Sequence, residues 1–227
     1  SGLVNATAVT NLTGTASALA TLMAAEADSG NAVNLDDDFT VTVSDTGSVL
    51  ATHLNSIDNK TSGLITASSI TNIEGTSSVV NSVYASTHIN GIGNESVSQT
   101  DTELNASLLV TTDSNTTGTV DASLITTLTG NSVDLAAVYA SNGTATGISG
   151  LNNENVTISE TGGTTVSNVN LINSYTTGVV TATISDGNMS TLTGLNGDDN
   201  QQFTITVTDT TVSASEAITL ETKTGLV

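Results

Sequence analysis

Apolar residues alternate with threonine or serine in four short stretches of this chain. The stretches are residues 39–46, 97–102, 156–161 and 203–210, and the first and last are nearly identical. A period of two residues is typical of a β-strand with one face turned toward the core. In the second stretch Ser96-Val-Ser-Gln99 interrupts the alternation. The pattern predicts four strands, of which the second is the least regular.

Each alternating stretch ends in Asp-Thr or Glu-Thr, which favours the N-cap of a following helix. Apolar residues at helical spacing come next, and similar sets follow Gly14 and Gly130. These residues are Val49, Leu50, Leu54 and Ile57; Leu19, Leu22 and Met23; and Val133, Leu135, Ala136 and Tyr139. The spacing therefore predicts short helices that alternate with the strands.

A glycine-bounded phrase returns along the chain and divides it into repeats. It spans residues 2–14, 63–75 and 118–130, and returns in a looser form over residues 178–194. The start-to-start spacings are 61, 55 and 60 residues. The expected organisation is repeat 1 over residues 1–62, repeat 2 over 63–117, repeat 3 over 118–177, a truncated repeat 4 over 178–224 without its first helix, and the start of a further repeat at 225–227.

Tandem repeats of strand and helix predict an α/β parallel β-solenoid with short helices. Each repeat would contain two strand-plus-helix coils, and neighbouring coils would stack because none can bury its apolar face alone. The alternative is an all-β parallel β-helix in which the helical pieces are extended.

Composition agrees with a thin layered core. The chain has no Pro, Cys or Trp, while Thr and Ser number 44 and 28. With 22 Asp and Glu against two Lys, the formal net charge is −20, which repels nucleic acid and anionic membranes. No stretch approaches the roughly 20 apolar residues of a membrane span. We expect neither nucleic-acid binding nor membrane insertion.

An acidic or amide-rich turn precedes each second strand. Carboxylate and amide oxygens are the ligands that Ca²⁺ prefers, so the turns are candidate calcium sites. Turns also favour Asn, Asp and Gly for conformational reasons alone. The candidate ligands are Asp36, Asp37, Asp38, Asn94, Glu95, Asn153, Glu154, Asp198 and Asp199.

Other chemistry has little support in the sequence. His53 and His88 lie in unrelated contexts, and no nucleophile or phosphate-binding motif accompanies them. Alternate threonines in residues 203–208 could form a flat row that binds ice, although such threonines also suit an ordinary exposed strand face. We predict no enzymatic activity.

The phrases Val120-Asp-Ala-Ser-Leu-Ile-Thr-Thr-Leu-Thr-Gly130, Asp134-Leu-Ala-Ala-Val-Tyr-Ala-Ser141 and Ile148-Ser-Gly-Leu151 resemble giant tandem-repeat cell-surface proteins of marine cyanobacteria, of the swimming-associated type. The Val-Ser-Asp-Thr and Val-Thr-Asp-Thr phrases resemble repeats of bacterial adhesins and haemolysin-type surface proteins. The resemblance implies a secreted or cell-surface scaffold without catalytic residues. From the repeats and open strand edges we expect a structural or adhesive protein whose partners are copies of itself or further repeats, joined end to end in a filament or surface layer. A surface module that binds ice or carbohydrate is the alternative.

Overall fold

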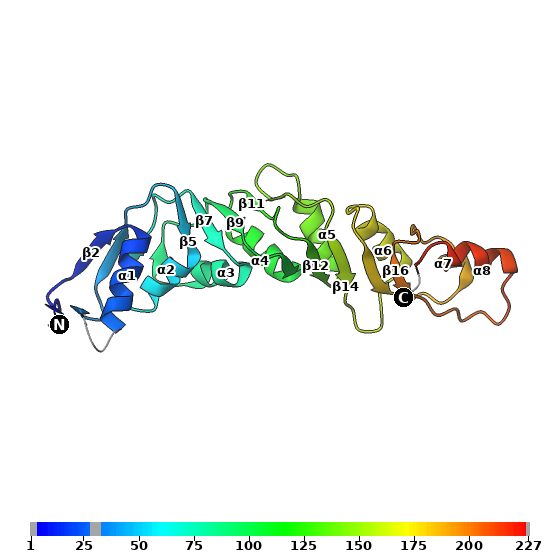
Figure 1. The fold of residues 1–227 in the computed structure, drawn as a ribbon, viewed down its shortest axis with the longest axis horizontal. Helices are drawn as coiled ribbons and strands as arrows, with labels where there is room; N and C mark the ends of the chain where they lie inside the picture. Colours follow the sequence, from blue (N-terminus) through cyan, green and yellow to red (C-terminus); the bar gives the residue numbers. More distant parts are fainter. Residues whose placement is uncertain (1–3, 28–32, 226–227) are drawn as a thin grey trace. The chain divides into compact units, whose positions relative to one another are not determined.

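The computed structural model describes residues 4–27 and 33–225 as an α/β protein of parallel strands and short helices (Figure 1). Two compact bodies result, which we describe separately. The N-terminal body comprises residues 1–100, 111–121 and 145–147, and the C-terminal body comprises residues 101–110, 122–144 and 148–227. No helix in the described part of the chain is long and apolar enough to cross a membrane.

In the N-terminal body, parallel strands follow one another at a regular interval. Strands β2, β4, β6 and β8 are neighbours in that order, as are β5, β7, β9 and β11, while β1 pairs with β3. Paired residues such as Ser48 and Asn72 are 24 positions apart. The strands are β1 (Val4–Asn5), β2 (Asn11–Gly14), β3 (Val33–Asn34), β4 (Thr40–Val43), β5 (Ser48–Leu50), β6 (Ile65–Thr66), β7 (Asn72–Gly75), β8 (Ile89–Asn90), β9 (Ser96–Gln99) and β11 (Val120–Asp121).

The C-terminal body repeats this arrangement. Its sheet has the order β10, β12, β14, β15, β16, again parallel throughout. Its strands are β10 (Glu103–Asn105), β12 (Thr127–Gly130), β13 (Ile148–Ser149), β14 (Asn155–Ile158), β15 (Val180–Thr183) and β16 (Gln202–Thr204).

Short helices separate successive strands. They are α1 (Ala16–Ala27), α2 (Ala51–Asp58), α3 (Ser77–Ala85), α4 (Ala106–Asn115), α5 (Ser132–Ser141), α6 (Val166–Asn173), α7 (Met189–Leu192) and α8 (Ala214–Glu221). In the N-terminal body α1 contacts α2 and α2 contacts α3, and in the C-terminal body α5 contacts α6 (Figure 1). We call the strand or strands before a helix, together with that helix, a segment. The helices contradict the all-β alternative.

The core lies between strands and helices and is almost entirely aliphatic. In β4, Val41 and Val43 are buried while Thr40 and Thr42 are exposed, as the alternation predicts. The helices bury every third residue, for example Ala51, Leu54 and Ile57 of α2. The apolar pattern was thus a sound guide to strands and to most helix faces. Val133 is an exception, because it projects into solvent from α5. The prediction was also wrong for Val49 and Leu50, which lie in strand β5 before α2 begins at Ala51.

Two irregularities of the sequence take a different form in the structure. Ser96–Gln99 does form a strand, and Gln99 turns inward with 2% of its surface exposed. Ser77 Oγ donates a hydrogen bond to Gln99 Oε1 at 3.0 Å, which satisfies the side-chain oxygen, whereas the buried Nε2 has no hydrogen-bond partner among the described residues. In repeat 4 the first helix is shortened to the single turn α7, which precedes Gly194 instead of following it.

The acidic residues after the strands do not cap the helices that follow them, so that prediction was wrong. Leu50, the N-cap of α2, makes no side-chain capping bond. The carboxylates instead accept from the first backbone N–H of the preceding segment's helix. Asp45 accepts from Ala16 N, Glu160 from Ser132 N and Asp186 from Val166 N, each at 2.7 Å, and Asp209 accepts from Met189 N at 2.5 Å.

These carboxylates join neighbouring segments. An anion at a helix N-terminus satisfies an unpaired N–H and interacts favourably with the helix dipole. Ser132 also donates through its hydroxyl to Glu160, and these hydrogen bonds lower the pKa of the Glu160 carboxyl. Each acid therefore ties the segment that carries it to the one before.

Glycine is required where one segment crosses closest to the next. A Cβ on Gly63 would lie 2.2 Å from the carbonyl oxygen of Phe39, on Gly118 it would lie 2.3 Å from that of Glu95, and on Gly178 it would lie 2.2 Å from that of Glu154. The glycines that open the second, third and fourth repeat phrases are thus explained by close backbone approach.

We predict that Gly178→Ala destabilises the protein by about 1–3 kcal/mol, because the new methyl group collides with a backbone carbonyl. Gly47→Ala is the matched control, since a Cβ there has no neighbour within 4 Å. It should change stability by less than about 1 kcal/mol. Chemical unfolding of both variants, followed by circular dichroism, measures the difference, and equal stabilities would contradict the close approach.

Candidate functional site

The predicted calcium ligands divide into exposed and buried residues. Asp36, Asp37, Asp38, Asn94, Asn153, Asp198 and Asp199 are exposed. Glu95 and Glu154 are buried, with 2% and 1% of their surface accessible. The turns therefore have two kinds of acidic residue with different surroundings.

Glu95 turns inward from its loop and is held by neighbouring donors. The hydroxyl of Tyr84 on α3 donates to its carboxylate, and the backbone N–H groups of Gly93 and Asn94 donate to Oε2 at 2.9 and 3.1 Å. The backbone carbonyl of Glu95 accepts from Thr116 Oγ1 at 2.6 Å, and Gly118 N donates to that same Oγ1 at 3.0 Å. The residue therefore connects three parts of the N-terminal body.

The C-terminal body contains the same arrangement around Glu154. Tyr139 on α5 donates to the carboxylate, and Asn152 N donates to Oε2 at 2.9 Å. Thr176 Oγ1 donates to the Glu154 carbonyl at 2.6 Å. The ring of Tyr139 also stacks on that of Tyr175, with centroids 5.1 Å apart. We call the two sets the Tyr–Glu clamps.

Both clamp tyrosines stay protonated over the ordinary pH range. Burial raises the pKa of the Tyr84 and Tyr139 hydroxyls far above the usual value, and the hydrogen bond and negative charge of Glu95 or Glu154 act in the same direction. A buried carboxylate is tolerated only when donors surround it. Each tyrosine hydroxyl therefore supplies one such donor over the ordinary pH range.

Repeat 1 fills the equivalent positions with apolar side chains. Met23 aligns with Tyr84 and Tyr139, and Phe39 aligns with Glu95 and Glu154; both are buried, and the Phe39 carbonyl accepts from Thr61 Oγ1 at 2.5 Å. In repeat 4 the equivalent residue is Phe203, which is buried, and its carbonyl accepts from Thr224 Oγ1 at 3.3 Å. Aligning the repeats shows that Tyr at the helix position occurs with Glu in the loop, and Met with Phe. This signal was present in the sequence, but it is not visible when each motif is considered alone.

The clamp chemistry is that of a structural joint. The carboxylates of Glu95 and Glu154 each accept hydrogen bonds from their own loop and from a helix tyrosine, inside the body. Within the described residues no group of three or more His, Asp or Glu side chains is arranged to hold a metal ion. Calcium binding at the exposed turns stays a prediction.

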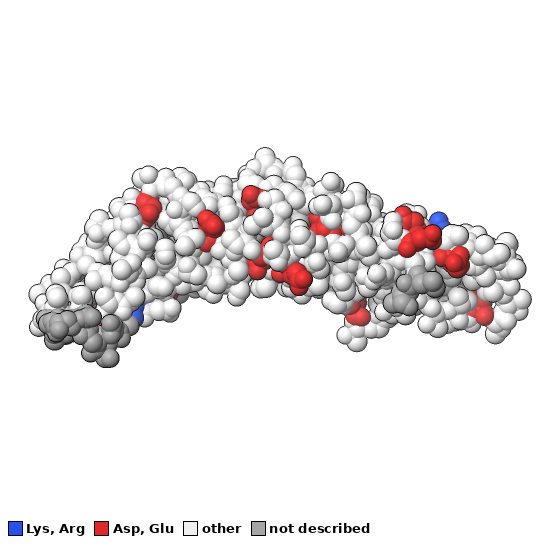
Figure 2. All heavy atoms as spheres, in the orientation of Figure 1, with Lys and Arg blue, Asp and Glu red and all other residues white. Residues whose placement is uncertain are grey.

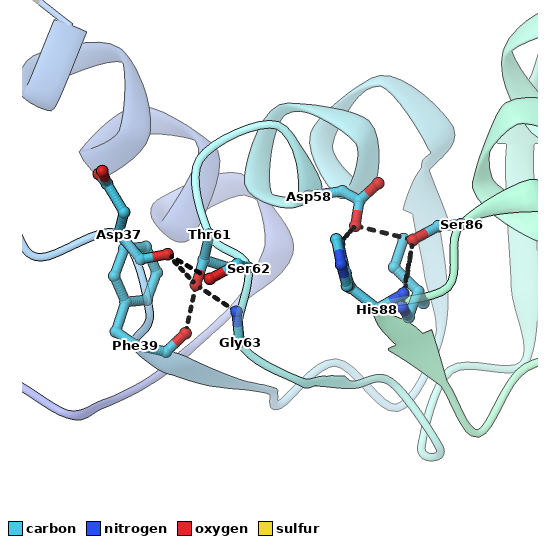
Figure 3. A network of polar contacts seen from close by, with 9 residues as sticks. Asp37, Phe39, Asp58, Thr61, Ser62, Gly63, Ser86 and His88 are labelled. Atoms are coloured by element: carbon cyan, nitrogen blue, oxygen red, sulfur yellow. Dashed lines mark hydrogen bonds and ion pairs between the residues drawn. The ribbon is translucent and has the colours of Figure 1, made fainter.

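A second polar cluster in the N-terminal body contains His88 (Figure 3). His88 Nδ1 lies 3.4 Å from Asp58 Oδ1, and Ser86 Oγ donates to the same oxygen at 2.7 Å. Ser86 Oγ also accepts from the backbone N–H groups of His88 and Ile89 at 3.0 and 3.2 Å. In this geometry Ser86 faces the carboxylate and the backbone, so the cluster fixes a turn and lacks the Ser–His contact of a nucleophilic triad.

Beside this cluster, Lys60 Nζ pairs with Glu26 at 2.7 Å. Lys60, His88, Glu26 and Asp37 border an open hollow of about 400 Å³. Figure 3 shows how the backbone carbonyl of Asp37 receives the donors of Thr61 and Ser62 on one side of this region. Nothing in the sequence pattern indicates that Lys60 and His88 border the same hollow.

Neither the threonines nor the carboxylates on the outer surface form a large continuous patch in the views and strand rows described next. In the C-terminal sheet the outward row across the strands is Asn105, Thr129, Thr157, Thr181 and Gln202. Only three of these five are threonines, so the row is shorter than the alternation in residues 203–208 suggests. Figure 2 shows the carboxylates as separate small groups on the face drawn.

Comparisons with known proteins give no relative for this chain: no protein-family model, curated protein or solved structure matches it.

We predict that Tyr139→Phe destabilises the protein by about 1–3 kcal/mol, because a donor to the buried Glu154 is lost. The double variant Tyr139→Met with Glu154→Phe copies repeat 1. It should be more stable than the sum of the two single changes predicts, by about 0.5–3 kcal/mol. Denaturant unfolding measures the cycle. Tyr175→Phe, at a 39% exposed residue, is the control, and strict additivity of the pair would contradict the proposed equivalence.

For calcium, the exposed turn is the place to test. If Asp36, Asp37 and Asp38 bind the ion, calcium raises the melting temperature of the wild-type chain and the triple variant to Asn loses this rise. Because Glu95 and Glu154 are already hydrogen-bonded inside, Glu95→Gln and Glu154→Gln should keep it. If calcium does not raise the melting temperature of the wild-type chain, the calcium hypothesis is wrong. If either Gln variant loses the increase, the buried glutamates take part in binding the ion.

Proposed function

We propose that this chain is a length of α/β solenoid that serves as an extracellular structural or adhesive scaffold. In this proposal each repeat forms two strand-plus-helix coils, and the coils stack along one axis. Parallel pairing at an interval near 24 residues within each body supports it. The helices on one side and the aliphatic core between also fit α/β solenoids.

One observation carries the functional proposal: the same joint recurs from repeat to repeat. A threonine hydroxyl binds the carbonyl of the previous segment at Thr61, Thr116 and Thr176, each two residues before a close-packed glycine. An arrangement that recurs in this way sets length and spacing, whereas a catalytic site needs one unique convergence of groups. We therefore propose a spacer and not an enzyme.

The extracellular location is part of the proposal and rests on charge. A formal charge of −20 on 227 residues opposes compaction at low ionic strength. Salt shortens the range of this repulsion, from about 10 Å at 0.1 M to about 3 Å at 1 M. A saline exterior thus suits the chain.

Duplication of one whole repeat tests the scaffold. A second copy of residues 63–117 inserted before Gly118 adds two coils in phase, so the longest dimension should grow by about 10 Å, twice the spacing of neighbouring strands. Small-angle scattering measures this length. The same 55 residues in scrambled order are the control. An ordered chain of unchanged length after duplication would overturn the solenoid.

The location has its own test. Antibodies raised against the chain should label intact, unpermeabilised cells of the source organism. Labelling that appears only after permeabilisation would contradict an extracellular scaffold.

A further inference from the structure

Three asparagines of this chain are each followed directly by glycine. They are Asn90, Asn142 and Asn196. An asparagine amide next to glycine is chemically labile, because glycine has no side chain to keep its backbone nitrogen from reaching the amide carbon. Folding decides which pair can react, since the amide must be free to turn back and the glycine nitrogen must be free to attack. The surroundings of the three pairs differ in both respects.

The pair Asn142–Gly143 is held on both sides by hydrogen bonds. Asn142 Nδ2 donates to the carbonyl of Leu151 at 3.0 Å, and Leu151 N donates to Asn142 Oδ1 at 3.4 Å. Gly143 N donates to the carbonyl of Ile148 at 2.8 Å. Reaction at this pair would therefore require these hydrogen bonds to break first.

The pair Asn90–Gly91 is restrained by its strand. Asn90 lies in β8 opposite Thr66 of β6, and its carbonyl accepts from Ala67 N at 3.0 Å. A strand keeps the backbone extended and directs the side chain out of the sheet, away from the following nitrogen. Gly91 is also closely packed, since a Cβ there would lie 2.7 Å from that of Ser68. The Asn90 side chain is exposed, but the backbone around it is held.

The pair Asn196–Gly197 has neither restraint. It lies in the loop after α7, outside any helix or strand, and Asn196 is exposed. Within residues 4–27 and 33–225, neither the side-chain amide of Asn196 nor Gly197 N makes a hydrogen bond. The attacking nitrogen and the amide group are thus both free.

The fold nevertheless requires glycine at position 197. A Cβ there would lie 2.1 Å from the backbone carbonyl oxygen of Lys223, which passes close to the loop. The close approach that packs this loop therefore also fixes the residue that makes Asn196 labile.

Asn196 lies at a joint between α6 and this loop. Its backbone N–H donates to Asn170 Oδ1 at 2.7 Å, and its carbonyl accepts from Asn173 Nδ2 at 2.5 Å. Asn170 Nδ2 also donates to the carbonyl of Gly194 at 2.8 Å. Neither bond of Asn196 involves the reacting atoms, but both depend on the normal length of its backbone.

From these observations we propose that Asn196 is a site of spontaneous deamidation in the folded protein. Gly197 N attacks Asn196 Cγ and closes a succinimide ring, while the bond from Cγ to Nδ2 breaks and ammonia leaves with the proton of the glycine nitrogen. Water then opens the ring at either carbonyl. The products are aspartate and isoaspartate, in which the main chain passes through the side-chain carbons.

The products change the joint in two ways. Isoaspartate lengthens the main chain, so the hydrogen bonds to Asn170 and Asn173 no longer fit together. Either product adds a carboxylate close in sequence to the exposed Asp198 and Asp199, which increases local repulsion. The proposal does not depend on the scaffold function. It assigns the chain a modification site that weakens one junction with time.

Peptide mapping by mass spectrometry tests the site in the full chain. After incubation at mildly alkaline pH, conversion at Asn196 should be at least about tenfold faster than at Asn142, because hydrogen bonds must break first at Asn142. Asn90 should also convert more slowly than Asn196. In concentrated urea the three sites should convert at similar rates, because the restraints of the fold are gone. Equal rates in the folded chain, or an unconverted Asn196, would overturn the proposal.

Two variants test the consequence for the joint. Asn196→Gln keeps an amide but closes the corresponding larger ring far more slowly, so it should keep its stability during the same incubation. Asn196→Asp carries the added charge on a backbone of normal length. The purified isoaspartate form of the wild-type chain should unfold at a lower denaturant concentration than Asn196→Asp. Equal unfolding midpoints would overturn the proposed weakening of the junction.

Discussion

The structure depends on a close parallel return of the backbone to its own previous segment. At Gly63, Gly118 and Gly178 the chain passes so near a carbonyl of the preceding segment that a methyl group does not fit. A threonine two residues earlier donates to that same carbonyl. Between these fixed points the segments tolerate different lengths, from a single helical turn in α7 to twelve residues in α1. The constraint on the fold is therefore local, and it is applied once per repeat.

The interior beside this close approach contains either apolar side chains or a glutamate. A glutamate is tolerated there when hydrogen-bond donors surround its carboxylate. Phe39 needs no donors, whereas Glu95 and Glu154 need several and receive them from a tyrosine and from their own loops. A buried charge is costly when any donor is missing and adds little when all are present. The Tyr–Glu pair and the Met–Phe pair should therefore contribute similarly to stability, whereas a combination of one member from each pair should be less stable. In repeats 1 to 3 the two positions change together, from Met with Phe to Tyr with Glu.

The sequence predicted the local elements better than the contacts between them. Alternation at residues 39–43 and helical spacing at residues 51–58 each depend on neighbours within one segment, so both could be recognised. The role of Asp45 and Glu160 could not, because their partners, the N-termini of α1 and α5, lie 29 and 28 residues earlier. The inward turn of Glu95 was hidden because an Asn-Glu loop looks polar unless Tyr84 is aligned with Met23. Comparing repeats position by position would have exposed it.

Burial in this chain is a property of the neighbouring segment more than of the sequence. Val43 and Val207 have almost the same flanking residues, yet only Val43 lies beneath a further layer. Each segment thus gains apolar burial, strand pairing and helix capping from the next one along, as in a one-dimensional array. A chain stabilised in this way gains little from a particular length and much from a covered end. The physical forces that fold one repeat onto another are therefore the forces that bury the apolar side chains of each segment.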